Sequence, residues 1–257
     1  MILCLDAGNT RLKWGLWDGA GWREQGACAH VAIGELPRSL PVPPLQIVAC
    51  NVAGARVAAQ IEAFAGALAV PLEWFRSSAA AGGVVNGYDN PAQLGTDRWA
   101  ALIGARALHV GAALVVMAGT ATTIDVLDAD GVFRGGLILP GLDLMRQALA
   151  RNTAGLPEAC GSYRATPTNT DDAIVSGALQ ATLGAIERMA AQICRTASAD
   201  FCSRRPANSD FLCLLSGGAA AALAPHLNLP LRQIDNLVLA GLVRSWHDKH
   251  NNHNHCA

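Results

Sequence analysis

The sequence of 257 residues has almost no net charge and no long apolar run. Lys and Arg total 19 against 20 Asp and Glu, so the net charge is −1 and there is no basic excess to attract nucleic acid or an anionic membrane. The apolar stretch 110–120 is too short to cross a bilayer, and Asp6 interrupts the N-terminal apolar run before it reaches the length of a signal-peptide core. We therefore expect a soluble protein with no nucleic-acid or membrane partner.

The eight cysteines include no Cys-x-x-Cys pair, so the usual sequence signature of a zinc site or a thioredoxin-like centre is missing. Several cysteines lie in apolar, strand-like runs such as 211–215. We interpret them as reduced core thiols of a cytoplasmic protein. Hydrophobic residues make up 51% of the chain, which is enough to fill the core of one large domain or two small ones.

Two polar, Gly-rich loops, one in each half of the chain, separate apolar segments of strand length. The first is Asp6-Ala7-Gly8-Asn9-Thr10, and the second is Gly119-Thr120-Ala121-Thr122-Thr123. A second apolar segment and an Asp-Gly turn follow each loop, and the spacing from Asp6 to Asp18 equals that from Ala118 to Asp130. This repeat predicts a duplicated α/β fold whose two domains face each other across a central cleft.

The rest of the chain continues this alternation of short apolar runs and helical periodicity. We expect domains at 1–113 and 114–246 and a polar, disordered tail at 247–257. The histidines of the tail could chelate a metal, although a frayed terminus is the alternative. The expected strands are 1–5, 12–17, 22–29, 45–50, 72–75, 114–117, 124–127, 132–139 and 211–215, and the expected helices are 53–69, one from residue 99, 142–150, 171–196 and 237–246.

The small residues and hydroxyls of the two loops allow backbone N–H groups to wrap a phosphate, although two ordinary hairpin turns would look the same. Asp6 ends the first strand at its loop and Asp125 follows the second loop, so either carboxylate could bind Mg²⁺ or another hard cation. Ser216-Gly217-Gly218 follows a later strand and leads into 219–223. Its glycines permit the close approach of a flat or anionic ligand, or serve only a tight turn.

Gly95-Thr96-Asp97-Arg98 directly precedes an apolar helix, so we expect Thr96 to cap the helix and Asp97 to lie in its first turn. A carboxylate there suits the acceptance of a proton from a substrate hydroxyl, and the adjacent Arg98 suits the docking of an anionic group. The alternative is a purely structural acid, because acidic residues are common in first helical turns.

Taken together, these segments resemble the type III pantothenate kinases, which belong to the superfamily of acetate and sugar kinases, heat-shock ATPases and actin. The joint occurrence of Gly-Thr-Asp-Arg with Ala-Gly-Thr-Ala-Thr-Thr-Ile-Asp is specific to that family. The matching segments span nearly the whole chain in order, and they are 6–13, 88–91, 95–99, 118–125, 135–141, 169–174 and 216–218.

The resemblance implies a ribonuclease-H-like, actin-like fold and the ATP-dependent phosphorylation of pantothenate, the first step of coenzyme A synthesis. It implies ATP, Mg²⁺ and a monovalent cation (K⁺ or NH₄⁺) as cofactors, and a homodimer in which Thr170 reaches the partner's pantothenate. Asp97 is the implied general base. Other implied residues are Tyr88, Gly95, Thr96 and Arg98 for pantothenate; Asp6, Gly8, Asn9, Thr10, Lys13, Gly119, Thr120, Thr122, Gly217 and Gly218 for Mg²⁺-ATP; and Asp6 and Asp125 for metal ions.

Two alternative functions use the same fold without this chemistry. One is a non-catalytic accessory factor acting in the transcription of virulence genes, because a fold can outlive its activity. The presence of Asp6, Asp97 and Asp125 favours the enzyme over that alternative. The other is an actin-like or chaperone ATPase, for whose subdomain insertions 257 residues leave no room.

Overall fold

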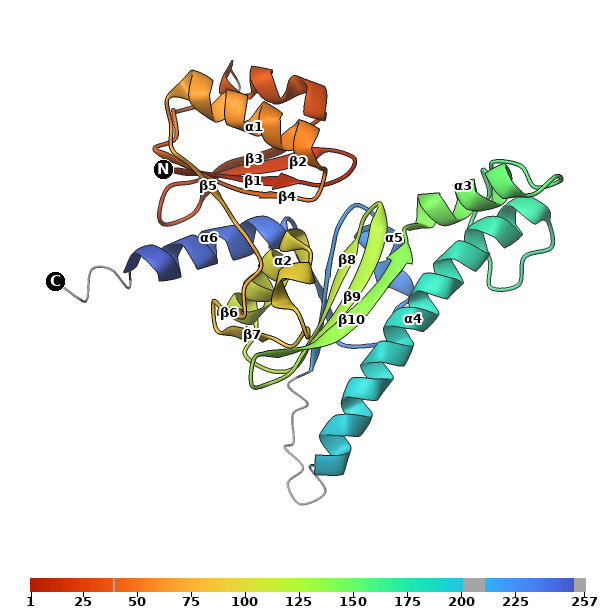
Figure 1. The fold of residues 1–257 in the computed structure, drawn as a ribbon. Coiled ribbons are helices and arrows are strands. Elements are labelled where there is room, and N and C mark those ends of the chain that lie inside the picture. The colour runs from red at the N-terminus through yellow and green to blue at the C-terminus, as the bar shows by residue number, and fades with distance from the viewer. Residues whose placement is uncertain (39, 201–210, 252–257) are drawn as a thin grey trace. The chain divides into compact units, whose positions relative to one another are not determined.

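A computed structural model describes residues 1–38, 40–200 and 211–251 (Figure 1). Its internal contacts divide the chain into two units. The first contains Met1–Val110, the short segment Gly131–Phe133 and the C-terminal segment from Asn236, and the second contains Gly111–Asp130 and Arg134–Asp235. The C-terminal segment therefore groups with the first unit, whereas we had expected residues up to 246 to form part of the second domain.

The first unit contains a five-stranded sheet in the order β3-β2-β1-β4-β5. β1 is antiparallel to β2 and parallel to β4, and all six residues of β1 are buried, as expected for a central strand with helices on both faces. The strands are β1 (Ile2–Ala7), β2 (Leu12–Trp17), β3 (Trp22–Cys28), β4 (Gln46–Asn51) and β5 (Leu72–Trp74).

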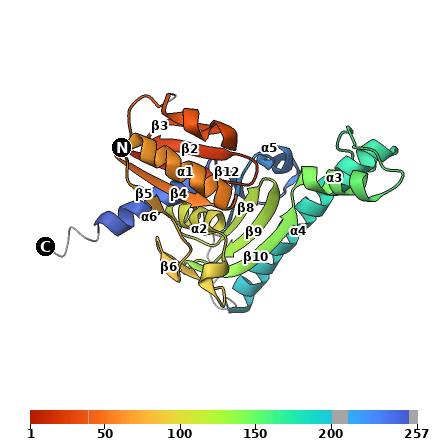
Figure 2. The ribbon, with the colours of Figure 1, turned by 45° about the horizontal axis from the view of Figure 1, so that its top comes forward.

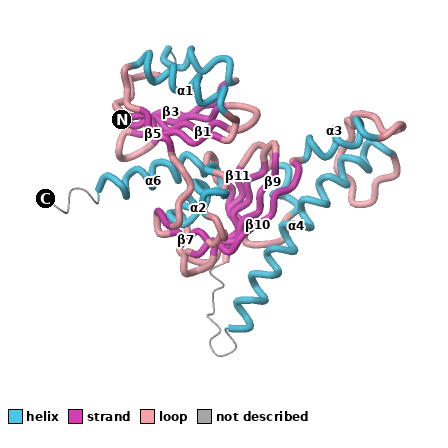
Figure 3. The backbone as a smooth tube through the Cα atoms, in the orientation of Figure 1, coloured by secondary structure: helices cyan, strands magenta, loops and turns pink. Residues whose placement is uncertain are grey.

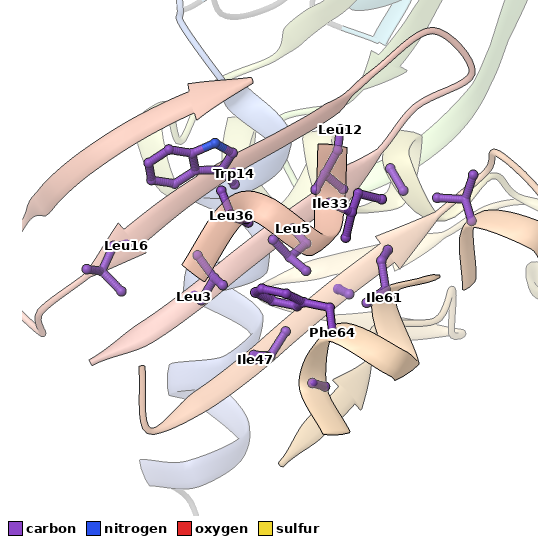
Figure 4. Close-up of a cluster of buried hydrophobic side chains, with 14 residues drawn as sticks. Leu3, Leu5, Leu12, Trp14, Leu16, Ile33, Leu36, Ile47, Ile61 and Phe64 are labelled. Carbon is purple, nitrogen blue, oxygen red and sulfur yellow. The ribbon is translucent and has the colours of Figure 1, made fainter. Parts of the chain in front are cut away.

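Alternate residues of β1 point to opposite faces of the sheet. Both faces are therefore apolar, and helices cover both of them. Leu3 and Leu5 pack with Phe64 of α1 (Ala55–Leu68) and with the 3₁₀ segment η1 (His30–Arg38), as Figure 4 shows. On the opposite face, α2 (Thr96–Leu108) and α6 (Leu237–Asn251) contact β4, and α6 also contacts β1. Figures 1 and 3 show α1 and α6 on opposite sides of the sheet.

α6 packs closely on α2 because glycines remove side chains from their contact. A Cβ atom on Gly104 would lie 2.6 Å from the carbonyl oxygen of Leu237, and one on Gly241 would collide with the carbonyl oxygen of Ala100. The two backbones can approach to this distance only without those Cβ atoms. This contact joins the C-terminal segment to the first unit.

Two short strands in the first unit were not expected from the sequence, because 77–87 consists mostly of small residues. They are β6 (Ala80–Ala81) and β7 (Val84–Asn86), and the 3₁₀ turn η2 (Pro91–Gln93) follows them. β7 runs parallel to the beginning of β10, with Val85 paired with Val132 and Asn86 with Phe133.

Five strands of the second sheet repeat the strand order of the first, as β10-β9-β8-β11-β12, and β7 and β6 extend the same sheet beyond β10. β8 is antiparallel to β9 and parallel to β11, as β1 is to β2 and β4. This repetition confirms the predicted duplicated, ribonuclease-H-like α/β fold. The strands are β8 (Ala113–Ala118), β9 (Ala121–Leu127), β10 (Val132–Pro140), β11 (Leu212–Ser216) and β12 (Leu231–Gln233).

A long helix, α4 (Thr170–Asp200), covers one face of the second sheet, and Figure 2 shows it beside β9 and β10. Leu183 and Ile186 of α4 pack in one core with Val116 and Ile124 of the sheet. α3 (Leu142–Asn152) precedes α4, while the short α5 (Ala220–Leu223) and η3 (Ala224–His226) follow β11. No helix among the described residues is long and apolar enough to cross a membrane.

Three differences from the expected helix boundaries concern candidate site residues or the tail. α2 begins at Thr96 itself, and Gly95 rather than Thr96 is its N-cap. α4 begins at Thr170, one residue earlier than expected, and the side chain of Asn169 accepts a hydrogen bond from the amide of Asp172. α6 continues to Asn251, so residues 247–251 are helical and not part of a disordered tail; residues 252–257, with His253 and His255, lie outside the described residues.

Most of the cysteines whose side chains the structure describes match the expectation of reduced core thiols. Cys4, Cys50 and Cys213 are free and buried, and Cys28 is free and half-buried. Cys160 is free but exposed, because it lies in the irregular segment between α3 and α4 and not in a strand, so the expectation was wrong for this residue.

Candidate functional site

Asp6 lies at the carboxyl end of β1, between two neighbours placed by the strand register. Lys13 of β2 pairs with it on one side and Cys50 of β4 on the other, and the Cys50 thiol donates to Asp6 Oδ1 at 3.5 Å. Asp6 is only 8% exposed. Burial raises its pKa to about 6; the carboxylate of Asp97 adds to this rise, while Lys13 and the Cys50 hydrogen bond oppose it.

Asp97 lies in the first turn of α2, as expected, and its Oδ1 accepts a hydrogen bond from the Arg98 amide at 2.8 Å. Asp6 points to the face of the first sheet on which α2 packs, since Leu5 and Ala7 point to the other. Asp97 is close enough to raise the pKa values of both Asp6 and Cys50. The structure thus brings two acids from distant parts of the sequence together in the first unit.

Arg98 and Tyr88 form a pair next to this acid. Arg98 is 4% exposed, and its Nη1 donates to the Tyr88 hydroxyl at 2.9 Å. Its guanidinium carbon also lies 5.6 Å from the centre of the Tyr88 ring. A cation placed in this way is attracted by the ring face and keeps a fixed orientation.

The first phosphate loop is open at its tip. Asn9 and Thr10 are exposed, and a Cβ atom on Gly8 would meet nothing nearer than the Arg11 carbonyl oxygen at 3.6 Å. His30 Nε2 donates to the Gly8 carbonyl at 2.9 Å and so holds one side of the loop. The backbone of this loop is therefore accessible to a ligand while remaining anchored.

The second phosphate loop is confined by glycines. The Gly141 amide donates to the Thr120 carbonyl at 2.9 Å, and a Cβ atom on Gly141 would collide with the Gly119 carbonyl oxygen. Gly217 has φ +103 and lies against the carbonyl of Ala118, where a Cβ atom would also collide. The second unit therefore brings the Ser-Gly-Gly turn and the second loop into backbone contact. α5, which follows this turn, has only four residues.

Asp125 is fully buried on β9. Thr123 lies two residues before it and hence on the same face of the sheet, and Thr123 Oγ1 is buried with no hydrogen-bond partner in the described chain. Gly136 of β10 approaches so closely that a Cβ atom there would collide with Asp125 Oδ1. The glycine thus makes room for the carboxylate.

Thr170 lines an apolar groove of about 1090 Å³ within the second unit. The groove is lined by residues of α3, of the beginning of α4 and of the segment between them, including Leu149 and Ile174. Leu144 and Leu149 of α3 are each 39% exposed, although both are large and apolar.

The structure thus divides the expected site residues into two groups. Asp6, Gly8, Asn9, Thr10, Lys13, Tyr88, Gly95, Thr96, Asp97 and Arg98 belong to the first unit, and Gly119, Thr120, Thr122, Asp125, Thr170, Gly217 and Gly218 belong to the second. Within the described residues, no group of three or more His, Cys, Asp or Glu side chains could hold a metal ion.

Sequence reasoning did not select four residues that support these groups: His30, Cys50, Asn86 and Phe133. His30, Cys50 and Phe133 act through partners that are distant in the sequence, and Asn86 acts through residues of its own segment, so no known motif marks them. The segment 135–141 contains a Gly-Gly and a Pro-Gly pair, which mark Gly136 and Gly141 in the sequence. These pairs do not indicate that Gly136 makes room for Asp125 or that Gly141 lies against the carbonyl of Gly119.

A family model described as type III pantothenate kinase matches residues 2–192. Among curated proteins, the type III pantothenate kinase of Aromatoleum aromaticum is 53% identical over 245 residues, which cover 95% of this chain and 96% of that protein. The type III pantothenate kinase of Dechloromonas aromatica is 48% identical over 94% of this chain and 97% of its own length.

Similar solved structures include a protein from Campylobacter jejuni named as a Baf family transcriptional activator, with a TM-score of 0.62, 18% identity and coverage of 97% of this chain and 99% of that one. Another, from Sinorhizobium meliloti, is named as a 2-dehydro-3-deoxygalactonokinase and has a TM-score of 0.53 and 16% identity, with coverage of 97% and 99%. At these identities the likeness extends to the fold alone.

Proposed function

The chain belongs to the type III pantothenate kinase family, and on that premise we propose how its residues carry out the reaction. The reaction is the transfer of phosphate from ATP to pantothenate, the first step of coenzyme A synthesis. The observation that carries the proposal is the convergence of Asp6, Lys13 and Asp97 in the first unit. A non-catalytic role in transcription is not favoured.

Asp97 is the general base in this proposal. A primary alcohol is a poor nucleophile at neutral pH, and a carboxylate within hydrogen-bond reach orients it and accepts its proton as the bond to phosphorus forms. The position of Asp97 in the first turn of α2, next to the buried Asp6, supports this role. The helix fixes the backbone that carries the base, so little reorganisation is needed during the reaction.

Pantothenate binds through the neighbours of Asp97 in this proposal. Arg98 and Tyr88 contact its carboxylate, because a guanidinium and a phenol hydroxyl are both suitable donors to an acid group. Gly95 and Thr96 contact the same substrate. In support, Thr96 Oγ1 is buried and has no hydrogen-bond partner among the described residues, so its hydroxyl is available to a ligand.

Asp6 and the first loop form the proposed Mg²⁺-phosphate site. Asp6 is a buried carboxyl group beside the carboxylate of Asp97, and burial, followed by that neighbouring acid, raises its pKa. A divalent cation would compensate both effects through oxygen ligands, so the residues fit Mg²⁺. When bound, Mg²⁺ neutralises charge on the phosphate oxygens. Lys13 and the backbone of Gly8, Asn9 and Thr10 contact phosphates.

The second unit supplies the remaining ATP contacts in this proposal. Gly119, Thr120 and Thr122 hold phosphates, and Gly217 and Gly218 border the adenosine. Asp125 binds a monovalent cation, K⁺ or NH₄⁺. A cation fits there because Asp125 is fully buried and shares a face of β9 with the unpartnered hydroxyl of Thr123.

The test of Asp97 as a base is the Asp97→Asn variant. Asparagine keeps the size of the side chain but cannot accept the proton, so kcat for phosphopantothenate formation should fall by about 10²–10⁴ with ATP binding retained. Asp143→Asn is the matched control, because Asp143 is also an acid in the first turn of a helix. A variant of Asp97 that turns over normally would contradict the assigned mechanism.

We also propose a homodimer with composite sites in which Thr170 reaches the partner's pantothenate. The apolar groove beside Thr170 and the exposed leucines of α3 support a partner at this face, since a large apolar surface is costly to leave in water. Chains carrying Thr170→Arg and chains carrying Asp97→Asn should each be inactive alone. A heterodimer of the two has one site without either lesion, so mixing should restore part of the activity. Heterodimers that form without restored activity would show that each site is built from one chain.

A further inference from the structure

The strands β7 and β10 place two buried residues side by side behind Tyr88 and Arg98. Asn86 of β7 pairs in register with Phe133 of β10, and they are 7% and 0% exposed, respectively. Val85, the preceding residue of β7, points the other way and is 49% exposed. Asn86 and Phe133 therefore face the interior of the first unit.

The Asn86 amide fixes the backbone of the segment that carries Tyr88. Its Nδ2 donates to the carbonyl oxygens of Ser78 at 3.1 Å and Pro91 at 3.3 Å, while its Oδ1 accepts from the Tyr88 amide at 3.1 Å. These bonds use two donors and one acceptor of a single buried side chain, which an aspartate of the same shape cannot reproduce. The segment from Tyr88 to Pro91 is thereby tied to β7 at both ends.

Phe133 fixes the side chains of the pair. Its ring centre lies 5.2 Å from that of Tyr88, and the guanidinium carbon of Arg98 lies 5.8 Å from it. Arg98 thus faces two aromatic rings and also donates to the Tyr88 hydroxyl. A nearly buried guanidinium keeps one orientation when its surroundings are this restrictive.

We propose that Asn86 and Phe133 are positioning residues for substrate binding, which hold Tyr88 and Arg98 as a preformed receptor for the acid group of the substrate. This rests on the proposed role of Arg98 and Tyr88 toward pantothenate. Asn86 acts through the backbone of Tyr88, and Phe133 acts through the rings. Neither residue contacts the substrate.

The test compares Asn86→Asp and Phe133→Leu with Val85→Thr, a control on the same strand whose side chain points away. Asn86→Asp removes both donated hydrogen bonds, and Phe133→Leu removes the ring but keeps an apolar side chain. Each should raise KM and the calorimetric Kd for pantothenate by about tenfold, the effect of one lost buried interaction. KM for ATP should stay within about twofold, because the lesion is confined to the acid receptor. Val85→Thr should leave both KM values unchanged.

Wild-type protein and Arg98→Ala separate the possible failures. Wild-type protein that does not phosphorylate pantothenate would overturn the proposed function itself. If wild-type protein is active and Arg98→Ala raises KM for pantothenate, but the folded Asn86→Asp and Phe133→Leu variants behave like Val85→Thr, the positioning role is overturned. A parallel rise of KM for ATP and pantothenate would also overturn it, since that pattern indicates general disruption of the unit. Should Asn86→Asp fail to fold, Phe133→Leu alone decides between these outcomes.

Discussion

The two phosphate loops occupy equivalent places in sheets of the same strand order, yet they are built differently. In the first unit, Asp6 and Lys13 face each other across β1 and β2, and Gly8 has open space around it. In the second unit, Ala118 and Thr122 are the paired residues at the end of the hairpin, and Gly141 and Gly217 pack against its backbone. The first loop therefore offers charge, whereas the second offers closely packed backbone. Duplication of the fold preserved the scaffold while the chemistry of the two loops diverged.

The hairpin registers show the same divergence. Residues 8–11 lie between the paired ends Ala7 and Leu12 in the first hairpin, but only 119–121 lie between Ala118 and Thr122 in the second. The equal sequence spacing that indicated a duplication therefore does not mean equal loops. The second turn is tighter, and Thr122 and Thr123 belong to β9.

The largest effect that separates the two loops should come from Asp125, the buried acid of the second unit. Asp125→Ala should lower activity on the order of a hundredfold, because preorganised charge near the phosphates is lost. The remaining activity should no longer depend on K⁺. Steady-state rates in K⁺ and in a bulky organic-cation buffer measure this. Asp128→Asn is the control, since Asp128 is a partly exposed acid at the end of the same strand that pairs with Arg134. Equal wild-type rates in the two buffers would contradict the monovalent site.

A smaller effect should distinguish the glycines of the two loops. Gly217→Ala places a Cβ atom against the Ala118 backbone at a positive φ and should destabilise the protein by about 1–3 kcal/mol, with a higher KM for ATP. Gly8→Ala has space for its Cβ atom, so its melting temperature should remain close to wild type whatever happens to ATP binding. Thermal unfolding of both variants checks the contrast. Equal melting temperatures would show that backbone confinement is not specific to the second loop.

A further effect, on stability alone, concerns the charge of the first loop in the absence of ligands. The pKa of Asp6 is raised above its unfolded value of 3.8 to about 6, so ionising this group disfavours the folded state. The resulting loss of stability develops between about pH 4 and pH 6 and is complete at higher pH. Asp6→Asn should therefore be more stable than wild type by about 2–3 kcal/mol at pH 8, and the gain should disappear near pH 4.

Asp18→Asn serves as the control for that experiment because its expected sign is opposite. Amide hydrogen bonds from Ala20 and Gly21 lower the pKa of Asp18, so its charge favours the folded state above the unfolded pKa. Chemical denaturation across this pH range measures both variants. An Asp6→Asn variant that is less stable than wild type at pH 8 would contradict the prediction that the buried charge of Asp6 destabilises the fold when no cation is bound.

Local patterns were sufficient to predict the position of Asp97 and most strands of both sheets, although not the short β6, β7 and β12, because buried strands and first helical turns have short, direct signatures. They failed where a neighbour in space decides the structure. Thr96 was expected as an N-cap, but Gly95 occupies that position. Asn86 was not selected because it lies in a stretch of small residues, and its hydrogen bonds to Ser78, Tyr88 and Pro91 depend on how that segment folds back on itself.

The packing of α6 on α2 has a consequence for the order in which the protein can be completed during synthesis. Almost the entire second unit is encoded between α2 and α6, so the ribosome finishes it before the last helix emerges. Until then α2 lacks the partner that lies against its Gly104. The helix that carries Asp97 thus reaches its final surroundings only with the last residues of the chain, and a product truncated before Leu237 should contain a folded second unit while α2 lacks its packing partner.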